Sequence, residues 1–294
     1  MPEGDTIFRA ARALQQALAG KQVTAFESAY APLIAVHDNT PLTGRTIEQV
    51  ESRGKWLLMH FSGDLILATH MRMSGSWHLY RRGEPWKRGR AHMRIVIATV
   101  DIEAVAFDVP VAHFYTPRTL ERNTLIPQTE TDLLQKNFAP DDARSRLRAQ
   151  ADAEIGNALL NQQVMAGIGN VFKSEICFVC GIHPFRSVAS LGDAEIDALV
   201  TAAQRMLAAN VQDASGDRVV TYTGPRRTTR AADQRARLWV YGRQGHACRR
   251  CGTAILMRKQ GIGARSTYWC PQCQHSDTPV AGWATPVPRR KASC

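Results

Sequence analysis

Two pairs of cysteines constrain the fold of this chain more than any other feature. Cys248 and Cys251 form one C-x2-C pair, Cys270 and Cys273 form another, and 18 residues separate the two pairs. This spacing is typical of a zinc ribbon, in which four thiolates complete a tetrahedral shell around one ion. A closed shell leaves no position for a catalytic water, so we expect one structural Zn²⁺ that holds a short β-hairpin.

The remaining cysteines do not extend this site. Cys177 and Cys180 form a third C-x2-C pair, but no second pair remains to complete its shell. They lie in the apolar sequence EICFVC, so we interpret them as packing residues of a buried helix. Cys294 is interpreted as an incidental free thiol.

The first residues predict a helix that ends before Gly20. Asp5 is the expected N-cap, which places Pro2 and Glu3 just ahead of the positive end of the helix dipole. The apolar residues recur at helical spacing, and they are Ile7, Phe8, Ala11, Leu14 and Leu18.

The pattern then changes twice along the chain. Residues 21–111 contain short β-rich runs such as KWLLMHF and LILATH between turn signals, which predict an antiparallel sandwich or barrel. We interpret residues 127–142 as the connection to a second domain. Helical periodicity follows in EIGNALLNQQVMA, in VFKSEICFVC and in a longer segment with Asp193 near its cap. We interpret residues 216–230 as a mobile basic loop and residues 277–294 as a disordered tail.

The charge balance favours a polyanionic partner. The chain has 37 Lys and Arg against 26 Asp and Glu, a formal charge of +11. Such an excess favours nucleic acid through its field and through counterion release, although a basic protein without such a partner stays an alternative. No run of apolar residues is long enough for a transmembrane helix.

A glycine turn, GIGN, separates two of the predicted helices. Gly167 and Gly169 let the backbone approach a ligand closely, and Asn170 is placed to cap the next helix while the amides face an anion. Lys173, one turn later, adds positive charge. The turn is equally interpretable as an ordinary corner between helices.

The β-rich part also carries cations beside apolar residues. Lys55 follows a turn glycine in SRGKWLL, and His70, Arg72, Met73, Trp77 and His78 occur together in THMRMSGSWHLY. This mixture suits a surface where an apolar wedge enters stacked bases while cations hold the backbone. Core packing and solvated surface charges are the alternative explanation.

Taken together, several motifs resemble one family closely. The sequences PEG, RGK, HMRMSGSW, LLNQQVMAGIGNVFKSEI and a cysteine ribbon containing ARSTYWC resemble the formamidopyrimidine-DNA glycosylase / endonuclease VIII family of base-excision repair enzymes. The resemblance implies an α+β multidomain fold with DNA bound between domains. It implies an N-terminal β-sandwich catalytic domain (1–130), a helix-two-turn-helix domain (131–242) and a four-cysteine zinc finger (243–276).

The resemblance also implies the chemistry. Pro2, once Met1 is removed, would attack C1′ of a damaged nucleoside and form a Schiff base, whose electron sink permits β,δ-elimination. Glu3 matches the family's acid, and Lys55 matches the lysine beside the lesion phosphates. Asn170 and Arg265 match residues that bind the DNA backbone, Met73 looks like the residue inserted where the base has flipped out, and His70 is a further phosphate contact.

Departures from the family pattern bear on the substrate. Thr6 stands where a glutamate is frequent, and FDVPVAHFYTPRTL replaces the DPRRFG stretch of the purine-lesion branch. These differences favour the endonuclease VIII branch and oxidised pyrimidines. An oxidised-purine glycosylase, a non-catalytic DNA-damage-binding protein and a zinc-ribbon RNA-binding protein are the alternatives.

The expected partner is double-stranded DNA that contains oxidised bases or abasic sites. We expect a monomer with no membrane association. The expected location is the cytoplasm, on the nucleoid in a bacterium.

Overall fold

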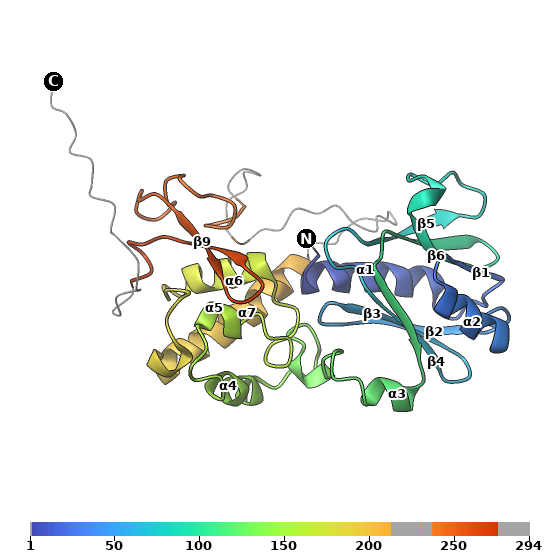
Figure 1. The fold of residues 1–294 in the computed structure, drawn as a ribbon, viewed down its shortest axis with the longest axis horizontal. Helices are drawn as coiled ribbons and strands as arrows, with labels where there is room; N and C mark the ends of the chain where they lie inside the picture. The colour runs from blue at the N-terminus through green and yellow to red at the C-terminus, as the bar shows by residue number, and fades with distance from the viewer. Residues whose placement is uncertain (1, 213–227, 229–236, 276–294) are drawn as a thin grey trace, which may run out of the picture.

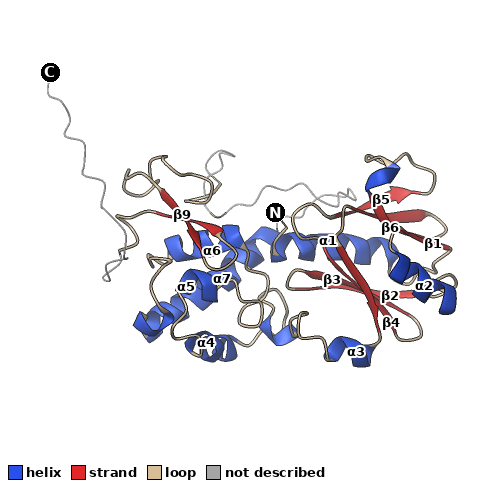
Figure 2. Cartoon of the chain, viewed as in Figure 1, coloured by secondary structure: helices blue, strands red, loops and turns tan. Residues whose placement is uncertain are grey.

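The computed structural model describes residues 2–212, residue 228 and residues 237–275. Strands dominate the N-terminal part and helices the C-terminal part, and the two parts lie side by side along the longest axis (Figure 1). Figure 2 shows the same separation, with a small hairpin beside the helices. The α+β organisation is therefore confirmed, while the predicted mobile loop, except Thr228, and the predicted tail lie outside the described residues.

The N-terminal part is a sandwich of two antiparallel four-stranded sheets, as predicted. Alternate residues face one core, for example Leu57 and Met59 of one sheet and Ile95 and Ile97 of the other. In spatial order, the sheets contain β1 (Ala25–Ser28), β6 (Met93–Ala98), β7 (Ile102–Phe107) and β5 (Ser76–Arg81), and β2 (Ile47–Arg53), β3 (Trp56–Phe61), β4 (Leu65–His70) and β8 (Val111–Tyr115).

Helix α1 (Gly4–Leu18) joins the two parts of the molecule. It packs against β2 and β3 and also contacts helix α7 (Asp193–Gln212) of the helical part (Figure 1). The N-cap is Glu3 rather than the predicted Asp5, because Glu3 has the extended backbone of a cap. Asp5 lies buried in the first turn, 3.6 Å from the guanidinium of Arg9.

Two short helices accompany the sandwich, α2 (Ala31–Asn39) and α3 (Pro117–Glu121). Helix α2 was missed, because its region was predicted to contain only strands. Its sequence begins with a proline in the first turn, which favours a helix start. Only Leu33 of this helix is buried, so it has no strong apolar stripe for the sequence to reveal.

The helical part contains α4 (Pro140–Arg148), α5 (Ile155–Ala158), α6 (Asn170–Val179) and α7. The helix predicted over EIGNALLNQQVMA is wrong beyond Ala158. Turns replace it, and the side chain of Gln162 takes over the backbone bonding: it donates to Leu160 O and Ile168 O and accepts from Gly167 N. A side chain that satisfies backbone groups in this way competes with a helix. Three 3₁₀ turns, η1 (Arg90–His92), η2 (Thr129–Thr131) and η3 (Val188–Ser190), complete the described helices.

The hairpin of β9 (Leu256–Gln260) and β10 (Arg265–Trp269) packs on α6. Arg250, between Cys248 and Cys251, connects the cysteine loop to α6: its guanidinium lies 4.4 Å from the centre of the Phe178 ring and donates to Phe178 O. Cys177 is fully buried in α6, and burial raises the pKa of its thiol to about 12. This agrees with its interpretation as a packing residue.

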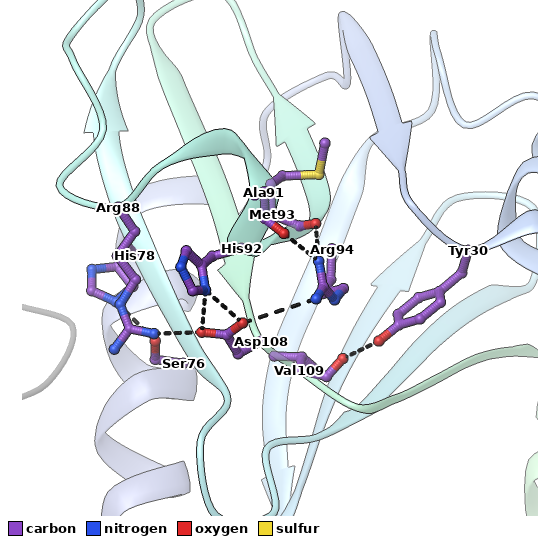
Figure 3. Close-up of polar contacts among 10 residues, drawn as sticks. All are labelled: Tyr30, Ser76, His78, Arg88, Ala91, His92, Met93, Arg94, Asp108 and Val109. Carbon is purple, nitrogen blue, oxygen red and sulfur yellow. Dashed lines mark hydrogen bonds and ion pairs between the residues drawn. The ribbon is translucent and has the colours of Figure 1, made fainter.

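A charged cluster fixes the connection between β7 and β8 (Figure 3). Asp108, at a φ of 50°, lies within 3.0 Å of His92 Nδ1 and accepts from Arg88 at 2.8 Å. Gly75 lies so close that a Cβ there would be 3.0 Å from Val109 Cα. The connection therefore braces residues 71–75, the loop that carries Met73.

Candidate active site

The carboxylate of Glu3 occupies the N-terminus of α6. Its oxygens accept from the backbone amides of Gly169 at 3.1 Å, Val171 at 2.8 Å and Phe172 at 3.2 Å. Glu3 is completely buried. These three bonds use the free amides at the N-terminus of α6 and hold the side chain of Glu3 in one orientation.

The N-terminal PEG sequence and the GIGN turn are fitted to each other. Gly4 N donates to Gly167 O at 2.8 Å. A Cβ on Gly4 would lie 2.6 Å from Gly167 Cα, and one on Gly169 would lie 2.2 Å from Glu3 Cδ. Because no larger residue fits at these positions, the glycines serve an approach between two parts of the chain.

This geometry corrects the predicted role of the GIGN amides. They were expected to face an external anion, but they bind the carboxylate of Glu3. Asn170 does not cap the helix: it is the first helical residue, and its Nδ2 donates to Ser266 O at 2.8 Å. An amide nitrogen carries two hydrogens, so the bond to Ser266 uses one of the two N–H groups of Asn170.

Lys55 lies in the turn between β2 and β3, and this turn contacts the helical part. Gly54 has a φ of 58°, and its N–H donates to Asp132 Oδ2 at 2.7 Å. A Cβ on Gly54 would lie 2.9 Å from Ala166 Cβ. The turn is therefore held against the residues that precede GIGN, which directs Lys55 toward the same region as Pro2.

His70 ends β4 and Met73 follows it in the next loop. His70 Nδ1 accepts from Arg72 N at 3.0 Å, which leaves the other ring nitrogen to carry the proton. Burial first, then Lys55 and Arg72, lower the pKa of His70 to about 4, so the ring is neutral near pH 7. Met73 is an exposed large apolar residue, with 66% of its surface accessible.

Trp77 does not belong to this surface. It is completely buried in the sandwich core, where its indole N–H donates to Thr69 Oγ1 at 3.1 Å. Its inclusion among the DNA-facing residues was therefore wrong. The strand alternation explains the result, because β5 turns Trp77 inward.

One cavity brings most of the predicted site residues together. It has a volume of about 510 Å³ and lies between the sandwich and the helical part. Apolar residues such as Leu125 and Leu160 form part of the wall. The predicted residues among its lining are Pro2, Lys55, His70, Met73, Asn170 and Arg265. Glu3 lies directly behind this wall, where Gly169 lines the cavity.

The four ribbon cysteines form a compact cluster. Their sulfur atoms all lie within 4.8 Å of one another, with Cys248 and Cys273 3.9 Å apart and Cys251 and Cys270 3.4 Å apart. Four thiolates bound to zinc at about 2.3 Å would be about 3.8 Å apart, so the donor set fits one structural zinc. No other group of three or more potential ligands gathers in the part of the chain that the structure describes.

Sequence reasoning missed two buried carboxylates that position this site. Asp132 holds the Lys55 turn, and burial raises the pKa of Asp132. Glu175 of α6 accepts from the amides of Trp239, Val240 and Tyr241, all within 2.9 Å, and burial raises its pKa as well. An acidic residue at the start of the apolar sequence EICFVC was the available signal for Glu175, and Asp132 offered none.

Comparison with known proteins decides the family. Residues 1–122 match the formamidopyrimidine-DNA glycosylase N-terminal domain, 130–221 match the formamidopyrimidine-DNA glycosylase H2TH domain, and 245–275 match a zinc finger found in FPG and IleRS. A probable endonuclease 8 2 of Streptomyces coelicolor is 42% identical over 99% of this chain and 100% of its own length. This chain belongs to the formamidopyrimidine-DNA glycosylase / endonuclease VIII family.

Other members of the family agree with this assignment. The DNA-(apurinic or apyrimidinic site) lyase Nei2 of Mycolicibacterium smegmatis is 38% identical over 93% of this chain and 99% of its own length. Lactococcus lactis Fpg, solved in complex with abasic-site DNA, has the same fold: the TM-score is 0.76 at 24% identity over 93% of this chain and 100% of that one. Among the described residues, no helix is long and apolar enough to cross a membrane.

Proposed function

We propose that this chain is a bifunctional DNA glycosylase and abasic-site lyase of base-excision repair. The observation that carries the proposal is the junction of PEG with GIGN, which places Pro2 on the cavity wall and Glu3 behind it. Lys55 and Arg265 line the same cavity and supply positive charge for a DNA backbone. A binding protein alone would have no use for this pairing of an N-terminal residue with a fixed carboxylate.

In the proposed reaction, removal of Met1 gives Pro2 a free secondary amine. The amine attacks C1′ as the bond from C1′ to the base breaks, and the base leaves with a proton. Glu3 serves as the nearby carboxyl group that moves protons to and from the opening sugar. The C1′–O4′ bond then breaks as O4′ takes up a proton, which opens the sugar and leaves an iminium between C1′ and the Pro2 nitrogen. The iminium makes the C2′ proton acidic, so the 3′ phosphate and then the 5′ phosphate are eliminated.

The remaining cavity residues would hold the DNA. Lys55, Asn170 and Arg265 would contact phosphates, and the neutral ring of His70 would donate one further hydrogen bond. Exposed Met73 would fill the space that the flipped nucleotide leaves. The zinc, held by the four cysteines, would keep the hairpin of Arg265 rigid and take no part in a chemical step.

Borohydride trapping tests the reaction. Incubated with abasic DNA and borohydride, the processed protein should form a covalent adduct, and a Pro2→Gly variant should form much less. A Pro85→Gly variant changes an exposed proline away from the cavity and should trap like the wild type. If the processed wild type forms no adduct, the protein is a DNA-damage-binding protein and the proposed reaction is wrong.

We further propose a preference for oxidised pyrimidines and action by a monomer in the cytoplasm, where bacterial DNA is found. Thr6 in place of a glutamate and the absence of a DPRRFG stretch support the pyrimidine preference. Excision rates on duplexes with single oxidised pyrimidines or purines measure it directly. Faster excision of oxidised purines would overturn the preference without affecting the lyase reaction.

A further inference from the structure

The two strands of the Arg265 hairpin, β9 and β10, are linked to α6 by a chain of buried polar groups. Lys173 of α6 donates from Nζ to Thr267 Oγ1 at 2.6 Å, and Thr267 Oγ1 donates to Gln260 Oε1 at 2.8 Å. Gln260 is the residue that pairs with Arg265 across the hairpin. The exposed Arg265 thus stands above a buried chain that begins at Lys173.

Gln260 attaches the other end of this chain to the helical part. Its Nε2 donates to Pro184 O at 2.8 Å and to Glu154 Oε2 at 2.9 Å. Gly156 makes room for it, because a Cβ there would lie 2.4 Å from Gln260 Oε1. The hairpin is therefore fixed to the helical part at the level of Arg265, close to the cavity.

Burying Lys173 at this position has a large desolvation cost. Its side chain is fully buried, and among the described residues it has no carboxylate within 4.0 Å. The pKa of Lys173 is lowered to about 8: burial is the main cause and Arg265 adds to it, while Cys177, Glu3 and Glu154 act in the opposite direction. A hydrophobic side chain of similar length would commonly be at least as stable in such a site, so stability does not explain the lysine.

We propose that Lys173 is a positioning residue that places Arg265 for its contact with the DNA backbone. The ammonium orients the hydroxyl of Thr267, which then donates to the partner of Arg265 across the hairpin. This inference rests on the proposed function, because it assumes that Arg265 binds a phosphate near the cavity. It replaces the sequence interpretation of Lys173 as part of a phosphate-binding surface, which its burial rules out.

A double-mutant cycle tests the proposal. The variants are Lys173→Met, Arg265→Gln and their combination, and the probe is a duplex that contains a tetrahydrofuran abasic analogue. Each single variant should bind about tenfold more weakly and should lower the salt dependence by about one ion. The combined variant should bind no more weakly than Arg265→Gln, because both changes remove the same contact. Lys173→Met should also unfold at the same temperature as the wild type or a higher one.

Controls separate this role from a general effect on folding. Lys21→Met removes a half-buried lysine that pairs with Asp101 outside the cavity, and the affinity of this variant should stay within about twofold of the wild type. If Lys173→Met does not fold, Thr267→Val breaks the same chain and should show the same lack of additivity with Arg265→Gln. Multiplied losses in the combined variant, or wild-type affinity in Lys173→Met, would overturn the proposal. A wild type that does not prefer the abasic duplex over an undamaged one would instead contradict the proposed function itself.

Discussion

Replacing Gly169 by alanine should displace Glu3 from the end of α6. The new Cβ would lie 2.2 Å from Glu3 Cδ and 2.4 Å from Cγ, well inside contact distance. The backbone itself tolerates alanine, since Gly169 has a φ of −117°. The substitution therefore acts on Glu3 and not through strain at residue 169.

The size of the effect follows from the bonds that are lost. Three backbone amides would lose a carboxylate acceptor, and a hydrogen bond to a charged group contributes about 1.5–3 kcal/mol. A misplaced acid would lower the rate of the chemical step about 100-fold or more. The assay is the rate of borohydride-trapped adduct formation with abasic DNA at saturating enzyme.

Gly89→Ala is the matched control for this substitution. No atom lies within 4 Å of a Cβ at Gly89, and its φ is −62°. This variant should form adduct at the wild-type rate. Adduct formation by folded Gly169→Ala within about threefold of the wild type would refute the role given to Glu3.

Three further predictions concern the zinc finger and two titrating groups. Cys270→Ser should weaken binding of abasic-analogue DNA by about tenfold or more, because Arg265 depends on the zinc finger for its position. The trapping rate at saturating DNA should change little. Unchanged DNA affinity would contradict this prediction. An NMR titration of His70 should show a midpoint near pH 4, as burial disfavours its charged form, and a midpoint above 6 would contradict the neutral ring. The pKa of Lys173 is lowered to about 8 from an ordinary 10.5. Between about pH 8 and 10.5 the unfolded chain therefore binds more protons than the folded one, so the free energy of unfolding should rise with pH in this range, relative to Lys173→Met. Parallel pH profiles of the two proteins would exclude the predicted shift.

The zinc cluster and the sandwich could be predicted because short patterns encode them. The spacing of the cysteines indicates the four zinc ligands directly, and in the structure their sulfur atoms lie within 4.8 Å of one another. The four are Cys248, Cys251, Cys270 and Cys273. Alternation in runs such as KWLLMHF reports which residues of a strand face the core. In both cases the controlling interactions repeat over a few residues, so the sequence alone contains the signal.

The environment of Glu3 could not be predicted in the same way. Its partners on α6 are more than 160 residues away in the chain, and no local pattern links the two segments. GIGN has the features of an anion site, and only the fold shows that the anion belongs to the protein. Lys173 was misread for the same reason, because a lysine beside a glycine turn gives no sign of complete burial.

The helix expected after Glu154 ends early, at Ala158, because of a competing local interaction. Its apolar spacing is helical, yet the side chain of Gln162 satisfies three backbone groups of the loop that leads to GIGN. Those bonds stabilise the turn that receives Gly4 and Glu3. The spacing of apolar residues alone does not show where a side chain competes with the backbone for its hydrogen bonds.

The central claim is that Pro2 is the nucleophile, and mass mapping of the trapped adduct tests it most directly. The reduced complex with abasic DNA would be digested, and the peptide that carries the sugar remnant would be sequenced. We predict that the remnant is attached to the nitrogen of Pro2, on a peptide that lacks Met1. Attachment to Lys55 or another lysine, or an intact Met1 on the modified peptide, would contradict the claim.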